Sequence, residues 1–187
     1  MNTTKIETLE VAGLIPAMKA LRLPYNKEPR SKTVIDEENT IYSEKFIAFE
    51  LSKTDYISKE DITLVKKLIT SGDEHAKVIR GIIVYAKITA PIYFWWDLET
   101  YIVGHQRLSS ESTMNAECKG LKGEAAQKAK ANILFGRLIT KIDYFSYQTL
   151  RRIYKQRLHH RLPEFQQFCK WIETLPLAKE LILTGLK

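Results

Sequence analysis

The chain is poor in the residues that form covalent cross-links or bind metals. Only Cys118 and Cys169 are cysteines among its 187 residues, too few for a disulfide scaffold or a four-cysteine zinc site. The eight glycines form neither a Gly-x-x-x-x-Gly-Lys-Ser/Thr nor a Gly-x-Gly-x-x-Gly motif, which argues against a glycine-rich phosphate loop. No His-Glu-x-x-His or Cys-x-x-Cys pair occurs, and we expect no metal ion.

Long apolar runs are also missing. No segment approaches the roughly 18 apolar residues that a membrane helix needs, and the first ten residues lack the basic and then apolar pattern of a secretion signal. Hydrophobic residues make up 44% and charged residues 27%, an ordinary globular composition. We therefore expect one domain over 1–187, located in the cytoplasm, with no membrane partner.

Acidic residues are scarce in one part of the chain, which we call the basic block (117–162). This block has eleven Lys and Arg against three Asp and Glu, a net +8 that leaves −1 for the rest of a chain whose total is +7. Such concentration favours an anionic partner: a nucleotide, a nucleic acid or an acidic protein surface. The alternative is that these side chains only solvate helix surfaces.

The spacing of apolar residues predicts a mixed α+β fold. Strands are predicted at 5–11, 82–89 and 140–146. Helices are predicted at 12–23, 58–69, 124–135, 147–158 and 164–175, with a last turn or two at 177–183. The aromatic segment 92–102 fits a strand or a helix, 104–115 is polar and typical of turns, and 22–44 is predicted to be a loop excursion.

An aromatic run leads directly into a cluster of polar side chains. Residues 93–96 (YFWW) are followed by 105–113 (HQRLSSEST), which carries His105, Gln106 and Arg107 beside several hydroxyls. Hydroxyls and an arginine bind phosphate or carbonyl oxygens, and an aromatic ring covers a base, so this composition suits a nucleotide pocket. A place in the hydrophobic core is the other interpretation of the aromatic residues.

Three segments in order resemble the flavin-dependent thymidylate synthases. The run KITAPIYFWWDLETYIVGHQRLSSESTMN resembles the core of that family, with Ala-Pro-Ile-Tyr (90–93) on its turn and Ser-Glu-Ser (110–112) on its serine-rich part. Upstream, SGDEHAKVIRG is similar to a histidine-containing segment, through His75. Downstream, AKANILFGRLITKIDYFSYQTLRRIYKQR follows the family pattern without gaps. The resemblance covers roughly 60–175.

The chain departs from the family at its arginines. The family's Arg-His-Arg triplet falls on Thr-Tyr-Ile (100–102) or Ile-Val-Gly (102–104), depending on which end is aligned, and the arginine of the serine-rich end is also missing. His105 and Arg107 supply part of the missing positive charge, but they stand at other positions than the family's arginines. The resemblance therefore identifies a divergent member that lacks the Arg-His-Arg motif.

The resemblance implies a fold, a reaction and a set of site residues. It implies a single α+β domain with a central, mostly antiparallel sheet flanked by helices. It also implies the reductive methylation of dUMP to dTMP with methylenetetrahydrofolate, or a related pyrimidine modification, with FAD as cofactor, in a homotetramer with shared active sites. Arg157 is the expected catalytic residue. The expected nucleotide-binding residues are Lys130, Arg157, Ser110, Glu111, Ser112 and Arg107, and the expected cofactor-binding residues are His75, His105, Gln106 and Ser146.

Two other classes of function stay open. The missing arginines fit a non-catalytic or repurposed relative that binds a nucleotide or another anion. The segment LRRIYKQRLHHR (150–161) interleaves basic and aromatic residues, as nucleic-acid-binding modules do, although the resemblance makes a nucleic-acid partner the weaker hypothesis.

Overall fold

A four-stranded antiparallel sheet forms the centre of the molecule. In the computed structural model, residues 4–25, 27, 32–33, 47–50 and 55–186 are described. The strand order is β1-β5-β7-β6. The strands span Lys5–Ala12 (β1), Ile83–Pro91 (β5), Leu138–Ser146 (β7) and His105–Ser110 (β6). Every pairing is antiparallel, which confirms the predicted α+β architecture.

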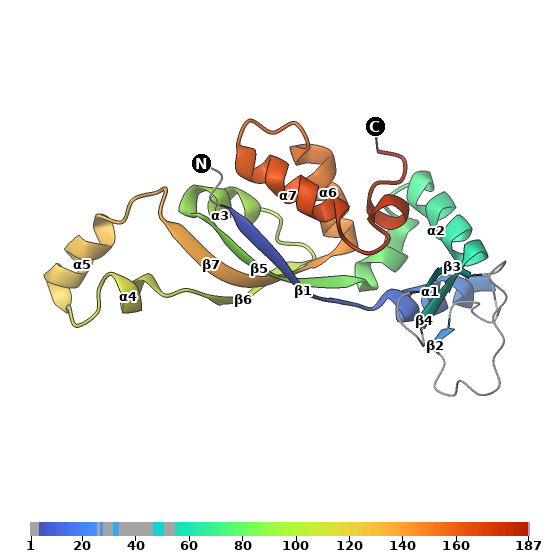
Figure 1. Cartoon of the computed structure of the whole chain (residues 1–187), viewed down its shortest axis with the longest axis horizontal. Helices are drawn as coiled ribbons and strands as arrows, with labels where there is room; N and C mark the ends of the chain where they lie inside the picture. Colours follow the sequence, from blue (N-terminus) through green and yellow to red (C-terminus); the bar gives the residue numbers. More distant parts are fainter. Residues whose placement is uncertain (1–3, 26, 28–31, 34–46, 51–54, 187) are drawn as a thin grey trace.

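Three helices lie on one face of this sheet (Figure 1). They span Ile92–Leu98 (α3), Tyr147–Arg157 (α6) and Pro163–Glu173 (α7). A core of aromatic rings fills the space between, since Phe168 lies 5.7 Å from Phe145 on β7, 6.0 Å from Phe94 on α3 and 5.0 Å from Trp171 (ring centroids). Full burial of each such side chain contributes about 1.5–3 kcal/mol.

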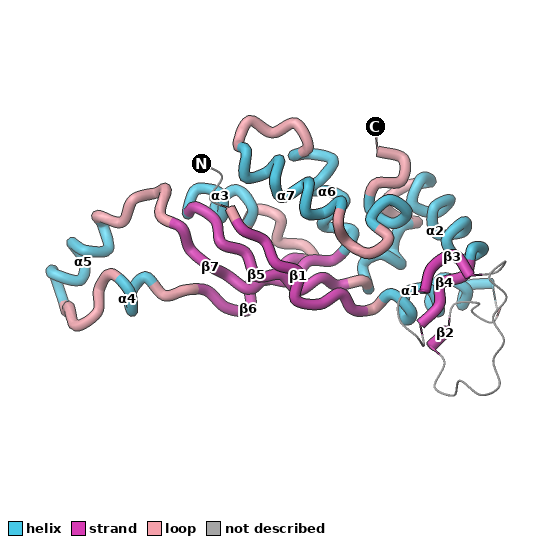
Figure 2. The backbone as a smooth tube through the Cα atoms, viewed as in Figure 1, coloured by secondary structure: helices cyan, strands magenta, loops and turns pink. Residues whose placement is uncertain are grey.

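A second cluster of elements lies at one end of the sheet (Figures 1 and 2). It contains Leu14–Arg22 (α1), Lys59–Ser71 (α2), a 3₁₀ helix at Ala76–Gly81 (η3), a short 3₁₀ helix at Leu23–Tyr25 (η1) and a π-helical turn at Ala178–Ile182 (η4). A small sheet of order β2-β4-β3 accompanies them, from Lys32–Thr33, Asp55–Ser58 and Ile47–Glu50.

An arm (111–137) extends from the opposite end, between β6 and β7 (Figure 1). It carries the short helix Thr113–Ala116 (α4) and the helix Gly123–Ala131 (α5). Neither helix buries a single side chain. The arm is therefore not part of the core that holds the sheet and its helices together.

Local sequence signals explain where several helices begin. Ser58 caps α2 by accepting from the backbone N–H of Asp61 at 3.1 Å, and Ser146 caps α6 in the same way through Thr149 at 3.2 Å. Pro163 occupies the first turn of α7, where a missing N–H costs nothing. The predicted helices and strands at these places are confirmed.

Other predictions needed correction. Strand β5 continues through Pro91 instead of ending at 89, because at Pro91 it pairs only with β7 and has no β1 residue opposite. The polar segment 104–115 contains strand β6, because pairing with β7 outweighs its turn-like composition. The ambiguous 92–102 begins as helix α3, α5 ends at Ala131 rather than 135, and the last turn is π-helical. Most of the excursion predicted at 22–44 lies outside the described residues.

Within the described residues, no helix combines the length and the apolar character needed to cross a membrane.

Candidate functional site

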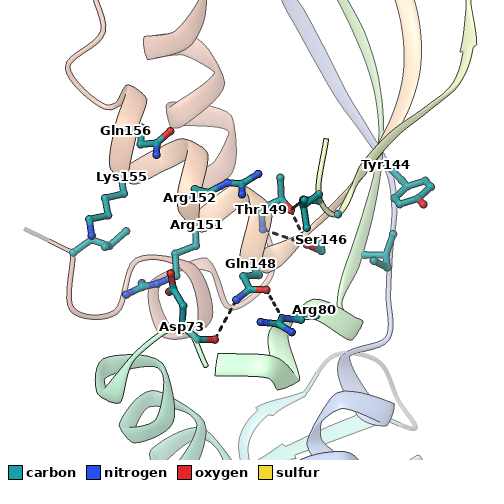
Figure 3. Close-up of a pocket in the computed structure, with 14 residues that line it drawn as sticks. Asp73, Arg80, Tyr144, Ser146, Gln148, Thr149, Arg151, Arg152, Lys155 and Gln156 are labelled. Atoms are coloured by element: carbon teal, nitrogen blue, oxygen red, sulfur yellow. Dashed lines mark hydrogen bonds between the residues drawn. The ribbon is translucent and has the colours of Figure 1, made fainter. Parts of the chain in front are cut away.

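A pocket of about 830 Å³ opens where β7 passes into α6 (Figure 3). We call it the larger pocket. Residues from η3, from the turn before β6, from α6 and from near the C-terminus line it. They are Asp73, Arg80, Ile83, Val103, Gly104, Tyr144, Ser146, Gln148, Thr149, Arg151, Arg152, Lys155, Gln156 and Leu186. The volume lies within the range of cofactor and nucleotide sites.

The lining of the larger pocket is strongly cationic. Arg80, Arg151, Arg152 and Lys155 face a single carboxylate, Asp73. Burial lowers the pKa of Arg151, and the negative charge of Asp73 partly offsets this effect. An arginine stays protonated under all native conditions, so the excess positive charge of the pocket persists and favours an anionic ligand.

Two of these cations are held by hydrogen bonds. Nη1 of Arg151 donates to the carbonyl oxygens of Ile182 at 2.5 Å and Thr184 at 2.7 Å. Nε of Arg80 donates to Oε1 of Gln148 at 2.5 Å, and the Gln148 amide donates in turn to the Asp73 carbonyl at 3.3 Å (Figure 3). Both guanidinium groups are thereby fixed in position before any ligand arrives.

The first turn of α6 forms one wall of the larger pocket. Thr149 Oγ1 donates to the Val103 carbonyl at 2.6 Å and lies 2.9 Å from Ser146 Oγ. Gly104 has φ +73°, and a Cβ added there would lie 2.5 Å from both hydroxyl oxygens. Only glycine permits this close approach, which holds the turn before β6 against the helix.

A smaller pocket of about 280 Å³ adjoins the larger one. Its lining is Thr100, Tyr101, Ile102, Val103, Arg152, Gln156 and Arg157. Val103, Arg152 and Gln156 line both pockets. The two pockets are therefore neighbours that share a wall, with apolar and aromatic side chains on one side of the smaller pocket and the polar face of α6 on the other.

Arg157 is anchored at the edge of the smaller pocket. Its Nε donates to the hydroxyl oxygen of Tyr101 at 2.9 Å, and its guanidinium lies 4.7 Å from the centre of the Phe165 ring. The Tyr101 hydroxyl then donates to Oε1 of Gln156 at 2.8 Å. These contacts hold the Arg157 guanidinium in one position. Its remaining N–H groups therefore keep a fixed direction.

Ser146 and Arg157 are the predicted site residues that the structure places in these pockets, Ser146 in the larger and Arg157 in the smaller. Gln106 lies beside the larger pocket, because it accepts from the Tyr144 hydroxyl at 3.0 Å. His75 is about half exposed, 3.5 Å from Glu74, two residues after the pocket residue Asp73.

His105 lies in the core rather than in a pocket. Its Nε2 is 2.7 Å from Oδ2 of Asp143, and both side chains are buried. Its ring stacks on Phe145 at 4.3 Å. Oδ1 of Asp143 has no hydrogen-bond partner in the described part of the chain. Within one chain, His105 thus acts as a buried partner of Asp143.

The remaining predicted residues lie along the edge strand and the arm. Arg107 pairs with Glu99 at 3.1 Å. Glu111 pairs with Arg137 at 2.9 Å, and this hydrogen bond lowers the pKa of Glu111. The hydroxyl of Ser110 donates to the carbonyl of Glu111 at 3.1 Å, Ser112 caps α4, and Lys130 donates to Thr113. Strand β7 begins beside the arm and ends in the larger pocket, so the arm lies a strand's length from that pocket within one chain, whereas Arg107 pairs with Asp143 part of the way along.

The sequence interpretation missed Asp73, Arg80 and Gln148. Asp73 and Arg80 belong to the segment SGDEHAKVIRG, from which only His75 was selected. The available signal was that this segment, which resembles part of a nucleotide-binding family, contains both an acidic residue (Asp73) and a basic residue (Arg80). Gln148 carried no signal, because its role depends on the spatial approach of Arg80.

The chemistry available here is binding and polarisation rather than nucleophilic attack. Cys169 is buried on the inner face of α7, and burial together with Glu173 raises the pKa of its thiol to about 12. A thiol with that pKa is protonated and unreactive near neutral pH. Among the described residues, no group of three or more His, Cys, Asp or Glu could hold a metal ion.

No protein-family model and no curated protein sequence matches the chain. Several solved structures match the chain. A flavin-dependent thymidylate synthase ThyX from Helicobacter pylori, complexed with FAD and dUMP, matches with a TM-score of 0.67 and 13% identity over 98% of this chain and 100% of that one. A second structure of ThyX from Helicobacter pylori with FAD and dUMP gives 0.68 and 13%, over 98% and 99%. A UMP/dUMP methylase, PolB from Streptomyces cacaoi, bound with 5-Br dUMP, gives 0.63 and 11%, over 95% and 94%. At these identities the likeness shows a shared fold.

Proposed function

We propose that this protein binds a pyrimidine nucleotide across the two adjoining pockets. The observation that carries the proposal is the pairing of a cationic pocket with a smaller one that ends at Arg157. The structural neighbours that were solved with dUMP or its 5-bromo analogue support the choice of a pyrimidine. We place the base in the smaller pocket beside Arg157, so that the phosphate extends towards Arg152, which lines both pockets.

The reaction that this arrangement supports is the flavin-dependent methylation of dUMP, or a related pyrimidine modification. Arg157 is the proposed catalytic residue, because a fixed guanidinium can polarise the carbonyl oxygens of the ring. Gln156, which accepts a hydrogen bond from Tyr101, holds the base beside it. This assignment keeps the role predicted for Arg157 and gives it a support that the sequence did not reveal.

The larger pocket fits FAD as a cofactor. Its donors match a diphosphate, because Arg80 and Lys155 face a cavity with one carboxylate, and Ser146 lies where a flavin-side residue is expected. FAD bound there would supply the reducing equivalents for the methylation. The chain itself would contribute binding, orientation and charge.

We propose further that the site is completed by a second copy, in a tetramer. The predicted phosphate ligand Lys130 and the serines near it lie on the arm, a strand's length from the larger pocket. Large apolar side chains gather where the arm leaves the sheet: Trp96 and Leu134 are 66% and 78% exposed, and Trp96 touches Phe135 at 4.7 Å. Exposed patches of this kind mark interfaces. Light scattering on the purified protein tests this, and a monomer would contradict it.

Binding experiments test the nucleotide and the flavin separately. Calorimetry with dUMP and with dGMP is expected to show binding of the pyrimidine nucleotide only, and loss of most of that affinity in Arg157→Ala. A protein that binds no dUMP would overturn the proposed function. Added FAD is expected to co-elute with the protein and give a flavin absorbance spectrum, which Arg80→Gln weakens.

A non-catalytic relative is the second candidate. The residues at 100–104 carry none of the arginines that the family resemblance predicts there, and this observation favours it. Growth of a thymidine auxotroph on this gene would refute this candidate, whereas dUMP binding without rescue would favour it.

A further inference from the structure

A chain of hydrogen bonds with a fixed direction lines the smaller pocket. It runs from Nε of Arg157 to the Tyr101 hydroxyl, 2.9 Å, and from that hydroxyl to Oε1 of Gln156, 2.8 Å. The direction is fixed because a guanidinium has donors and no acceptor. The Tyr101 oxygen accepts from Arg157, and its own proton is donated to Oε1 of Gln156.

This direction decides which end of the Gln156 amide faces the pocket. An amide has one acceptor oxygen and two N–H donors. Since Oε1 receives the Tyr101 proton, the donors on Nε2 remain, and Nε2 has no hydrogen-bond partner in the described part of the chain. Gln156 is solvent-exposed and lines both pockets, so these donors are accessible to a ligand.

The part of the smaller pocket formed by Arg157 and Gln156 therefore offers N–H donors to a ligand. Arg157 contributes its outer N–H groups, and Gln156 contributes Nε2. Uracil presents carbonyl oxygens at both of its substituted positions, and these oxygens accept. Cytosine presents an amino group where uracil has one of those carbonyls, and a donor placed against a donor leaves both without a partner.

We propose that Gln156, oriented by Tyr101 and Arg157, makes this site select uracil over cytosine nucleotides. This inference rests on the proposed function, because it concerns the base that lies in the smaller pocket. Gln156 touches the base and sets the specificity. Tyr101 is a positioning residue, since its 5% exposure and its two hydrogen bonds let it act only through its neighbours.

Tyr101 itself is firmly held, which makes the orientation of the amide stable. It follows α3 directly, its backbone N–H donates to the Leu98 carbonyl at 3.1 Å, and the Arg152 guanidinium lies 5.4 Å from its ring centre. With the phenol held in place, turning its O–H away from Gln156 would cost the hydrogen bond that it donates to Oε1. The preference for an acceptor is thus built into the unliganded protein.

Calorimetric titration with dUMP and dCMP tests the inference. The wild-type protein is expected to bind dUMP at least about tenfold more tightly, the change that one charged or unpaired polar contact produces. Gln156→Glu replaces the donors with a carboxylate, which accepts from an amino group, so the ratio is expected to reverse in favour of dCMP. Tyr101→Phe frees the amide to rotate, so the ratio is expected to fall towards one.

The matched control is Gln166→Glu, the same chemical change on α7 at a residue that lines neither pocket. It is expected to keep the wild-type ratio, which separates a change of contact from a change of net charge. Melting temperatures of all variants check that they fold.

The possible outcomes are distinct. A wild-type protein that binds dUMP and dCMP equally, or a Gln156→Glu variant that keeps the wild-type ratio, overturns the role of Gln156 and leaves nucleotide binding intact. A wild-type protein that binds neither nucleotide overturns the proposed function, and the inference with it. A preference for dUMP that Gln156→Glu reverses and Gln166→Glu preserves supports both.

Discussion

The two halves of the basic block form different surfaces. Helix α6 buries Leu150, Ile153 and Tyr154 against the core, so its cations are carried into two pockets. Helix α5 buries nothing, and the lysines of the arm stand in solvent. Exposed charges separated by more than about 10 Å are largely screened by salt, whereas partly buried charges such as Arg151 are screened much less. Packing, rather than the number of basic residues, decides which half can hold an anion.

The largest test of this difference removes one aromatic ring from the core against which α6 packs and one from the root of the arm. Phe168→Ala in the core is expected to lower the free energy of unfolding by about 3–5 kcal/mol, because it leaves a cavity among three other rings. Phe135→Ala at the root of the arm, where the ring is 48% exposed, is expected to cost about 1 kcal/mol or less. Urea denaturation measures both. Equal losses would show that the arm belongs to the core.

A second test uses two glycines with nearly the same backbone. Gly104 has φ +73° and Gly120 has φ +77°, but a Cβ would meet two hydroxyls at Gly104 and open space at Gly120. Gly120→Ala is expected to cost about 1 kcal/mol for the left-handed conformation alone. Gly104→Ala adds the clash and is expected to cost about 2–4 kcal/mol and to weaken ligand binding. If the two variants unfold alike, the turn before β6 is not held against α6.

A third test compares two serine caps. Ser146 accepts from the N–H of Thr149 at 3.2 Å at the start of α6, and Ser112 accepts from the N–H of Asn115 at 3.3 Å at the start of α4. Ser146→Ala is expected to lower the free energy of unfolding by about 1 kcal/mol, a usual value for a cap. Ser112→Ala affects only a four-residue helix outside the core and is expected to change thermal unfolding hardly at all. A similar drop in both would contradict the separation of arm and core.

The smallest effect concerns the ion pair at the base of the arm. Arg137 lowers the pKa of Glu111 from its ordinary value of 4.5, so the pair stabilises the fold above that pH and its contribution disappears as the pH falls through the lowered value. The Glu111 side chain is 40% exposed, so Glu111→Gln is expected to cost about 0.5 kcal/mol or less at neutral pH. Denaturation at two pH values measures it. A loss that persists in acid, where Glu111 is protonated, would exclude the ion pair as its cause.

Local signals in the sequence predicted most of the fold. The caps at Ser58 and Ser146 and the proline at the start of α7 act within a few residues, so they are visible without a structure. Strand β6 was missed because its residues are polar and exposed, and only pairing with β7 makes them extended. The helix α3 was ambiguous because four aromatic residues in a row show no amphipathic period, although only some of them are buried.

The roles of the candidate site residues stay predictions, but their positions can be compared with the structure. Ser146 and Arg157, selected by the order of segments along the chain, line the larger and the smaller pocket. The sequence shows no cation at 100–104, and the structure shows Arg152 and Arg157 of α6 facing that segment across the smaller pocket. This arrangement brings together residues about 50 positions apart, and no local pattern in the sequence indicates it.

The bond from Thr149 to the Val103 carbonyl has a consequence for folding order. Its two residues are 46 positions apart, whereas the cap that starts α6 spans only three. Contacts that close long loops form after local ones, because the entropy of the intervening chain must be lost first. Helix α6 is therefore expected to form before β6 pairs with β7. A refolding chain is then expected to regain its helical signal before it regains the capacity to bind a ligand.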